Sequence, residues 1–338
     1  MALDLGIDLG TANIIISTAG KGVVLSEPSV VAYNKKSESV VAVGNDAYEM
    51  LGRTPEYIVA IKPLRDGVIS DYDLTEEMIK QFIRKVTGRN LFNPRIIMCV
   101  PSRITDVERR AVVEAAINSG ARKVFLIEEP IAAMLGAGIN ITKPDGNMVV
   151  DIGGGTCDVA VISLGGIVKS ASIKCAGNKF DAAIIRYVST TYRVLIGDKT
   201  AEQLKIELIN LYDPDESKTL VIKGRSLITG LPQKVTVSQM DLYNATIELA
   251  LEIVDAIKEV SEQTPPELLG DIHTNGIILT GGGALLGGLP ELIKQKTNIF
   301  AYVAEEPVDC VAKGTRRAFK MLDILLDGFE NVSIYKYK

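Results

Sequence analysis

Hydrophobic and polar positions follow a strand-like pattern over the opening part of the chain. Short apolar runs, separated by glycines or polar turns, occur at residues 4–8, 13–17, 22–25, 29–33 and 40–43. Such spacing is typical of β-hairpins. Residues 46–51 predict a short helix that ends at Gly52. A longer helix is expected over 73–86, because its apolar residues share one helical face: Leu74, Met78, Ile79, Phe82, Ile83 and Val86.

Apolar strands alternate with helical stretches through the rest of the chain. Strands are expected at 95–100, 123–127, 148–152, 159–164, 167–176, 219–224, 233–236 and 276–279. Helices are expected at 105–119, 130–138, 180–194, 201–211, 241–262 and 289–297. This alternation predicts an α/β protein with largely parallel sheets. Because the opening hairpins add antiparallel strands, we expect mixed sheets.

The length and composition fit a globular protein of two or more domains. The chain has 338 residues, a length that is too great for a single ordinary core. Of these residues, 47% are hydrophobic and 23% are charged, as in a globular protein. Its net charge of −5 at pH 7 disfavours a groove for nucleic acid, so no nucleic-acid partner is expected. The single histidine, His273, argues against a His-based metal site or a catalytic triad.

The cysteines and the opening residues indicate a cytosolic protein. Cys99, Cys157, Cys175 and Cys310 form no CxxC pair, so we expect buried, reduced thiols. The opening residues lack the basic region of a signal peptide, and no apolar run reaches the ~18 residues of a membrane-spanning helix. We therefore expect a cytoplasmic protein whose membrane contact, if it has one, is peripheral.

Two glycine-rich turns each follow an apolar strand that ends in an aspartate. Residues 6–13 have the sequence GIDLGTAN and residues 149–156 have the sequence VVDIGGGT. Glycines let backbone N–H groups approach phosphate oxygens. Asp8 and Asp151 can face one Mg²⁺ through its water shell, because Mg²⁺ tends to keep several waters. The repetition predicts two similar half-domains that grip one nucleotide polyphosphate from both sides.

A third glycine-rich turn, TGGG at residues 280–283, also follows an apolar strand. One such turn is most often structural, but three of them after apolar strands indicate a nucleotide site. The chain contains neither the GxxxxGK[ST] motif of P-loop proteins nor the GxGxxG fingerprint of dinucleotide-binding domains. The nucleotide site is therefore expected to belong to another class of fold.

The three turns resemble the motifs of a known superfamily. Residues 7–11 (IDLGT), 151–156 (DIGGGT) and 279–283 (LTGGG) resemble the phosphate-1, phosphate-2 and adenosine motifs of actin, Hsp70 and the sugar kinases. Within this superfamily the chain resembles the MreB/Mbl family of bacterial actins, from residue 4 to about residue 325. The stretches that carry this likeness are 10–13, 27–30, 63–69, 106–110, 125–130, 264–268 and 311–314.

The resemblance implies an actin-like (ribonuclease H-like) fold of two similar domains, with mixed β-sheets flanked by helices and ATP in the cleft between them. One domain would comprise residues 1–140 plus 311–338, with a smaller subdomain inserted at about 31–63. The other would comprise residues 141–310, with a smaller subdomain inserted at about 175–240.

The resemblance also implies the residues that bind ATP and Mg²⁺. Asp8 and Asp151 would hold the hydrated Mg²⁺. The residues expected to bind the nucleotide are Gly10, Thr11, Ala12, Asn13, Gly153, Gly154, Gly155, Thr156, Glu202, Lys205, Gly281, Gly282 and Gly283. For Glu202 and Lys205, which would reach the ribose and base, a solvated charge pair three residues apart on one helix is the alternative.

Hydrolysis needs a water held in line with the γ-phosphate. Glu129 and Thr156 match the residues that position this water in the family, and Glu128 is the alternative to Glu129. Such a site positions the water without strongly abstracting its proton, so slow turnover is expected. Cys157 and Asp158 stand where the family usually has Thr and Glu, a departure that bears on hydrolysis and phosphate release.

The loop at residues 88–94 (GRNLFNP) places Leu91 and Phe92 among polar and turn-forming residues. The matching loop in the family dips into the inner leaflet of the membrane. The nearby basic residues, among them Arg89, favour anionic lipid by about 1 kcal/mol each. The alternative is that Phe92 folds back onto the core. The basic residues 334–338 are most simply a frayed terminus, and a second lipid or partner contact is the alternative.

The function that the resemblance implies is that of a cytoskeletal ATPase on the inner face of the cell membrane. Subunits would stack head to tail and pair laterally, antiparallel, with Val107 on the helix 106–119 as the candidate lateral contact. Cell-wall elongation or shape-determining proteins would be the partners, or in wall-less cells the filament would serve shape and motility. The alternatives are a soluble small-molecule kinase of the same superfamily and a plasmid-segregating actin, which would bind an adaptor–DNA complex.

Overall fold

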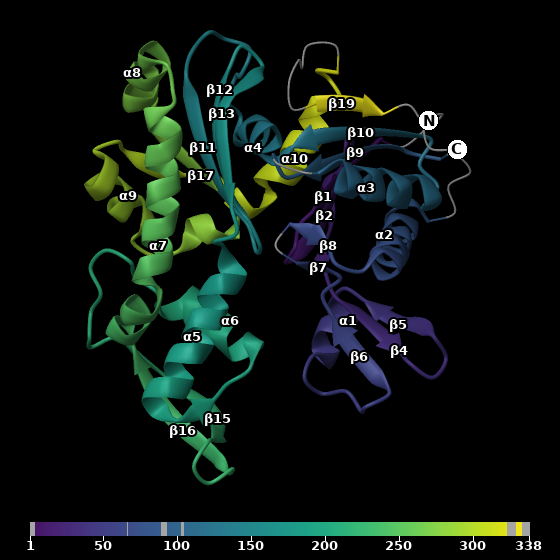
Figure 1. The fold of residues 1–338 in the computed structure, drawn as a ribbon. Coiled ribbons are helices and arrows are strands. Elements are labelled where there is room, and N and C mark those ends of the chain that lie inside the picture. Colours follow the sequence, from purple (N-terminus) through teal and green to yellow (C-terminus); the bar gives the residue numbers. More distant parts are fainter. Residues whose placement is uncertain (1–3, 66, 89–92, 103–104, 323–328, 333–338) are drawn as a thin grey trace.

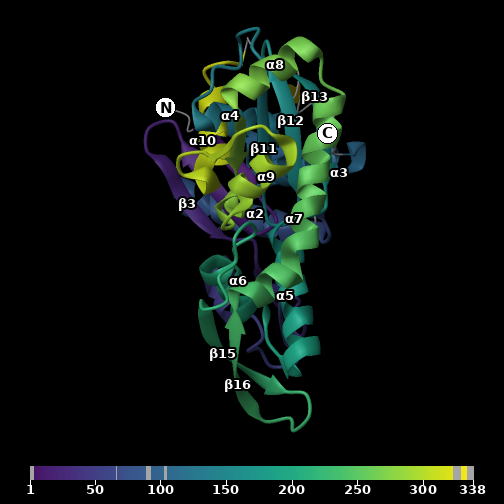
Figure 2. The same ribbon diagram turned by 90° about the vertical axis from the view of Figure 1, so that its left-hand side faces the viewer.

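A computed structural model describes residues 4–65, 67–88, 93–102, 105–322 and 329–332. The chain forms two columns that lie side by side, each with a large sheet at one end and a smaller sheet at the other (Figure 1). Viewed from the side, the molecule is long and narrow, and a hairpin forms its lower tip (Figure 2).

The first large sheet has six strands in the order β19-β10-β9-β1-β2-β3. Their bounds are β1 Asp4–Leu9, β2 Asn13–Thr18, β3 Gly22–Pro28, β9 Arg95–Val100, β10 Lys123–Glu128 and β19 Phe329–Val332. Strands β1, β2 and β3 form an antiparallel meander, whereas β9 runs parallel to both β1 and β10. The expectation of a mixed sheet is confirmed.

The second large sheet repeats this arrangement with five strands in the order β13-β12-β11-β17-β18. Their bounds are β11 Asn147–Ile152, β12 Cys157–Ser163, β13 Gly166–Ile173, β17 Ile277–Thr280 and β18 Ala301–Val303. Strands β11 to β13 form the antiparallel meander, and β17 lies parallel to β11 and to β18. The two glycine-rich turns therefore occupy equivalent places, each as the hairpin turn between the first two strands of a meander.

Helices cover both faces of each large sheet. One face of the six-stranded sheet packs on α2 (Tyr72–Thr87) and α3 (Asp106–Asn118). In the second, the outer face packs on α5 (Gly177–Tyr192), α7 (Gln239–Glu262) and α9 (Leu289–Thr297). Alternate strand residues divide between the two faces, because successive side chains of a strand point in opposite directions: Ile96 and Met98 face α2 and α3, and Ile97 and Cys99 face the junction between the sheets.

Two short helices, α4 (Glu129–Ala137) and α10 (Cys310–Ala318), pack between the two large sheets (Figure 1). They approach each other closely at glycines. A Cβ added at Gly136 would lie 1.7 Å from the carbonyl oxygen of Cys310, and one added at Gly314 would lie 1.7 Å from that of Ala132. Only a residue without a side chain fits at these two points, so the contact joins the halves of the molecule backbone to backbone.

Two smaller sheets lie at the opposite end of the columns. One has the order β5-β4-β6, with β4 Val31–Asn34, β5 Ser39–Val43 and β6 Ile58–Ile61, and it is covered by α1 (Asn45–Met50). The other has the order β14-β15-β16, with β14 Val194–Leu195, β15 Thr219–Ser226 and β16 Pro232–Ser238, and α6 (Asp198–Leu208) lies beside it. The remaining elements are β7 Leu64–Arg65, β8 Val68–Ile69, α8 Pro266–Asn275, η1 Gly282–Leu285 and η2 Pro307–Asp309.

Most elements lie where the hydrophobic pattern predicts them, although α8, β6 and β18 were not predicted. Two further differences concern α5 and α10. Helix α5 begins at Gly177, three residues earlier than predicted, because the N–H groups of Gly177 and Asn178 donate to the carbonyls of Gly153 and Gly154. Helix α10 was not predicted, since its buried positions between Val311 and Ala318 are mostly small residues, which leave no apolar periodicity. Within the described ranges, no helix is both long enough and apolar enough to span a membrane.

Candidate functional site

A cleft of about 910 Å³ lies between the two columns. Its walls include all three glycine-rich turns and both aspartates that precede the phosphate-type turns. Residues from the two small-sheet regions, among them Tyr48, Lys62 and Glu202, also line it. The elements that the sequence singled out thus converge on one cavity that both halves of the chain build.

The two phosphate-type turns touch each other across the cleft. A Cβ added at Gly154 would lie 2.6 Å from the Cβ of Ala12. The first turn is held by Ser29, whose hydroxyl donates to the carbonyl of Gly10 at 2.6 Å and whose N–H donates to the carbonyl of Ala12 at 2.9 Å. Because glycine leaves the second turn without a side chain at this point, both backbones can lie close to one polyphosphate chain.

The second turn is fixed by the start of helix α5. The N–H of Gly177 donates to the carbonyl of Gly153 at 3.1 Å, and that of Asn178 donates to the carbonyl of Gly154 at 2.8 Å. The N–H of Gly153 donates to the carbonyl of Thr156 at 2.9 Å, which closes the turn. This bonding rigidifies the backbone that lines the cleft.

Four carboxyl groups surround the two turns: Asp8, Asp151, Asp158 and Glu129. Asp151 and Asp158 are 5% and 1% exposed. Burial, together with the charge of Asp151, raises the pKa of Asp8 to about 8. Burial raises the pKa of Asp151 to about 7, although a 2.6 Å hydrogen bond from the Thr280 hydroxyl opposes this rise. In the described part of the chain, no ion pair joins a basic side chain to any of the four.

The donor set at these carboxyl groups fits a hydrated cation. Oxygen ligands at the base of a phosphate cradle are what Mg²⁺ prefers. Among the described residues, no group of three or more His, Cys, Asp or Glu side chains is arranged to hold a metal ion directly. A Mg²⁺ ion facing Asp8 and Asp151 would therefore take most of its ligands from water and phosphate.

Glu129 and Thr156 both line the cleft, on opposite sides of the junction between the sheets. Glu129 is the first residue of α4 and directly follows β10, and Thr156 directly precedes β12. Burial raises the pKa of Glu129 well above its usual range, and the charges of Asp158, Asp151 and Asp8 add to this rise. The Oδ1 of Asp158 accepts from the N–H of Ser102 at 3.4 Å, and its buried Oδ2 has no hydrogen-bond donor.

Glu202 and Lys205 line the cleft from helix α6 but do not pair with each other. The Nζ of Lys205 donates to Oδ2 of Asp181 at 3.0 Å and to the carbonyl of Gly177 at 3.3 Å. An oxygen of Glu202 accepts from the hydroxyl of Tyr48 at 2.8 Å. Both side chains are thus held by separate partners at the cleft wall.

The third glycine-rich turn packs on the end of β11. A Cβ added at Gly281 would lie 2.4 Å from the carbonyl oxygen of Ile152, and one added at Gly283 would lie 2.2 Å from the Ile152 side chain. The cleft wall here also includes Ile206, Leu285 and Val308, whose side chains are exposed. Sequence reasoning did not select these three residues, because a single apolar residue on a helix or turn carries no sequence signal for a ligand.

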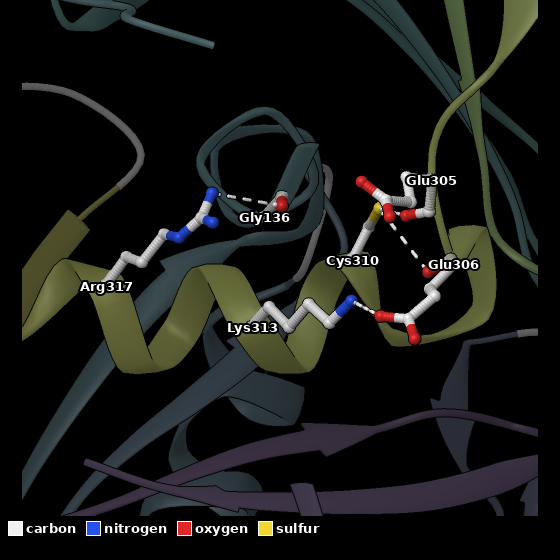
Figure 3. Close-up of polar contacts among 6 residues, drawn as sticks. All are labelled: Gly136, Glu305, Glu306, Cys310, Lys313 and Arg317. Atoms are coloured by element: carbon white, nitrogen blue, oxygen red, sulfur yellow. Dashed lines mark hydrogen bonds and ion pairs between the residues drawn. The ribbon is translucent and has the colours of Figure 1, made fainter. Parts of the chain in front are cut away.

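Helix α10, whose Val311 lines the cleft, contacts α4 (Figure 3). The side chain of Lys313 pairs with Glu306, and the thiol of Cys310 donates to the carbonyl of Glu306 at 3.7 Å. At the other end of the helix, Arg317 donates to the carbonyl of Gly136 at 3.1 Å. These contacts hold the segment with Val308, which lines the cleft, against the helix that begins with Glu129.

Three further predictions concern surfaces away from the cleft. Val107, the candidate lateral contact, is 79% exposed at the start of α3. The candidate membrane residues Leu91 and Phe92 lie outside the described residues, as does the basic segment 334–338.

The four cysteines are buried and form no disulfide, as the sequence predicts.

Comparison with known proteins places these features in a family. A family model described as MreB/Mbl protein matches residues 2–326. The chain is 52% identical to the cell shape-determining protein Mbl of Bacillus subtilis (strain 168), over 93% of this chain and 95% of that protein. It is 49% identical to the cell shape-determining protein MreB of Escherichia coli (strain K12), over 95% of this chain and 94% of that protein.

Solved structures show the same fold. The crystal structure of MreB5 of Spiroplasma citri bound to ADP has a TM-score of 0.91 and 38% identity, and it covers 95% of this chain and 97% of that chain. A chain of the MamK double helical filament has a TM-score of 0.81 and 21% identity, over 95% and 99% of the two chains. At that identity the likeness to MamK shows the actin-like fold alone.

Proposed function

The chain belongs to the MreB/Mbl family, and from this premise we propose that it is a bacterial actin that binds and slowly hydrolyses ATP and polymerises on the inner face of the cell membrane. The observation that carries this proposal is the convergence of three glycine-rich turns with Asp8, Asp151 and Glu129 on one cleft between two similar halves. The division into domains 1–140 plus 311–338 and 141–310, with subdomains at about 31–63 and 175–240, is part of the proposal.

ATP would lie with its phosphates between the turns at Gly10–Asn13 and Gly153–Thr156. The contact between Gly154 and Ala12 supports this placement, because it brings the backbones of both turns to one place in the cleft. The base would lie beside Gly281–Gly283, where Ile206, Leu285 and Val308 offer apolar surface. The S. citri relative, at 38% identity, has been crystallised with ADP and with AMPPNP, which supports an adenine nucleotide as the ligand.

Asp8 and Asp151 would hold Mg²⁺ through its water shell. When bound, this ion supplies positive charge that offsets the phosphate charge in the transition state. The two aspartates are suited to this role because burial and mutual repulsion make their ionised forms unfavourable without a cation.

Glu129 and Thr156 would orient the attacking water in line with the γ-phosphate. Glu129 stands at the N-terminus of α4, at the end of β10, so the backbone fixes where its side chain enters the cleft. Thr156 would hold the water from the opposite sheet. Because orientation is the main contribution of these groups, turnover would be slow and sensitive to cleft closure.

Polymerisation would couple to the nucleotide through closure of the cleft. A ligand that contacts both halves favours the closed arrangement, and hydrolysis weakens that preference. Subunits would stack head to tail, a contact that repeats without closing into a ring. Val107, which is almost fully exposed, would contribute to the lateral, antiparallel contact.

Membrane binding would use Leu91 and Phe92 together with the basic end of α2, where Arg84 and Lys85 are exposed. One loop binds lipid weakly, but a filament presents many copies and multiplies the affinity. The proteins that direct cell-wall elongation or cell shape would be the partners of such a filament.

The proposal is tested by electron microscopy and co-sedimentation with liposomes that contain anionic lipid, with and without ATP and Mg²⁺. We expect ATP-dependent paired filaments on lipid for the wild-type protein. The double variant Leu91→Ser/Phe92→Ser should still form filaments but should lose the lipid. Absence of filaments with phosphoryl transfer to a small acceptor would favour the kinase, and filaments that bind an adaptor–DNA complex in place of lipid would favour the plasmid-segregating actin.

A further inference from the structure

Tyr48 reaches across the cleft from one small-sheet region to the other. It lies on α1, which covers the sheet β5-β4-β6, and its hydroxyl donates to Oε2 of Glu202 on α6 at 2.8 Å. The two residues are 154 positions apart in the sequence. The Nζ of Lys199, also on α6, lies 4.2 Å from the centroid of the Tyr48 ring.

This contact is the polar connection between the two small-sheet regions. Of the hydrogen bonds and ion pairs found among the described residues, the Tyr48–Glu202 bond alone joins residues 31–63 to residues 175–240. Tyr48, Lys199 and Glu202 all line the cleft, and all three are half-buried. The bond therefore joins the two walls of the same cavity in which the nucleotide is proposed to lie.

The Tyr48–Glu202 hydrogen bond is stronger than an ordinary one, and Tyr48 remains its donor at physiological pH. A hydrogen bond to a carboxylate is stronger than one between neutral groups, and the ring adds a cation–π contact with Lys199. Burial and the bond to Glu202 raise the pKa of Tyr48 to about 12, so the phenol remains a donor at physiological pH. A carboxylate accepts several hydrogen bonds at once, so Glu202 can hold Tyr48 and still accept from a ribose hydroxyl.

We propose that Tyr48 is a positioning residue of the nucleotide site, supplied by the half of the molecule opposite Glu202. It holds the Glu202 carboxylate at the ribose end of the cleft and keeps the two small-sheet regions together over the nucleotide. Release of the nucleotide then requires that the Tyr48–Glu202 bond break first. This inference rests on the proposed nucleotide site and adds the element that sets how long a nucleotide stays bound.

The decisive variant is Tyr48→Phe, which removes the hydroxyl and keeps the ring over which Lys199 lies. We expect a fluorescent ATP analogue with Mg²⁺, chased by unlabelled ATP in a stopped-flow instrument, to dissociate about 10-fold faster than from the wild type, the loss of about 1.4 kcal/mol expected for a hydrogen bond to a charged group. Glu202→Ala, which removes the acceptor, should release the analogue at least as fast because it also loses the proposed ribose contact, and the double variant should be no faster than Glu202→Ala alone, because Tyr48 then has no bond left to lose.

Tyr57→Phe is the matched control. Tyr57 belongs to the same small-sheet region and has Lys36 4.8 Å from its ring centroid, but it does not line the cleft. We expect this variant to release the nucleotide at the wild-type rate. An unchanged melting temperature for both Tyr→Phe variants would exclude a general loss of folding.

A second readout needs no nucleotide. Spin labels on Ser37→Cys and Lys234→Cys would report the distance between the two small-sheet regions, since both positions are exposed and the four native cysteines are buried. We expect Tyr48→Phe to shift the distance distribution to longer values and Tyr57→Phe to leave it unchanged. If the wild type bound no nucleotide, the proposed function would fail. The distance measurement would still show whether the Tyr48–Glu202 bond holds the two small-sheet regions together. Unchanged distances and an unchanged release rate in Tyr48→Phe would overturn the inference.

Discussion

Asp151 and Asp158 lie directly opposite each other on the neighbouring strands β11 and β12, and both side chains are almost completely buried. Like charges at such a position destabilise a sheet. With Asp8 and Glu129 they form a group of four carboxyls to which no basic side chain of the described ranges is paired. The arrangement weakens the empty protein and favours a bound cation.

The stability of the protein free of metal and nucleotide should therefore fall as the pH rises. The pKa values of about 8 for Asp8 and about 7 for Asp151 lie above the unfolded value of 3.8, so the folded state binds more protons than the unfolded state between about pH 4 and pH 8. In that window the free energy of unfolding decreases with increasing pH. Calorimetry in EDTA should show a Tm that is lower at pH 8 than at pH 6.

Two controls bracket this pH prediction. Asp8→Asn should reduce the slope and raise the Tm of the empty protein near neutral pH, because the neutral amide needs no proton uptake on folding. Addition of ATP with Mg²⁺ should flatten the slope in the wild type but not in Asp8→Asn. A Tm that rises between pH 6 and pH 8 in EDTA would contradict the account.

Gly154→Ala should abolish tight nucleotide binding. The new Cβ would lie 2.6 Å from the Cβ of Ala12 and 3.1 Å from its backbone nitrogen, so the two turns would have to separate. Such overpacking costs about 1–3 kcal/mol, and it acts where the phosphates are expected. Titration with a fluorescent ATP analogue measures the effect. Gly270→Ala on α8, where a Cβ would meet no atom within 4 Å, should bind normally.

Gly136→Ala should destabilise the whole molecule more than it affects the site chemistry. The added methyl group would lie 1.7 Å from the carbonyl oxygen of Cys310, which is backbone and cannot move without shifting α10. We expect a loss of about 3 kcal/mol or more in the free energy of unfolding, measured by urea denaturation. The same substitution at Gly270 serves as the control, and an equal, small effect at both positions would show that α4 and α10 do not pack as described.

Glu129→Gln should slow ATP hydrolysis, measured as the rate at which phosphate appears, on the order of 100-fold because the water is no longer correctly oriented, with the affinity for ATP nearly unchanged. The amide keeps the size of the side chain but alters how it orients a water. Glu128→Gln tests the alternative assignment, because Glu128 is the neighbouring carboxyl at the end of the same strand. A turnover that falls in Glu128→Gln and not in Glu129→Gln would move the role to Glu128.

Much of this site is predictable from the sequence because its determinants are local. An aspartate at the end of an apolar strand followed by glycines marks each phosphate-type turn, and the predicted strands on both sides place the turn at a sheet edge. The helix caps are local as well, as the reciprocal bonds between Thr105 and Glu108 at the start of α3 illustrate.

Other features have no local signal. Helix α10 buries Ala312, Gly314 and Thr315, whose small size serves a close approach to α4 that only the folded chain reveals. Tyr48 stands on a six-residue helix, and nothing near it indicates a partner on α6. Asp158 could be recognised as an unusual residue after the turn, but its position beside Glu129 depends on how two sheets meet. Contacts between distant segments require the three-dimensional arrangement.

The central claim, that nucleotide in this cleft drives assembly, is tested most directly by sedimentation of the wild type and Asp151→Asn at increasing protein concentration, with and without ATP and Mg²⁺. The account predicts that the wild type pellets above a critical concentration only when ATP and Mg²⁺ are present, and that Asp151→Asn, which lacks one of the two carboxylates facing the cation, remains in the supernatant under every condition. Pelleting of Asp151→Asn at the wild-type critical concentration, or pelleting of the wild type that is indifferent to nucleotide, would contradict it.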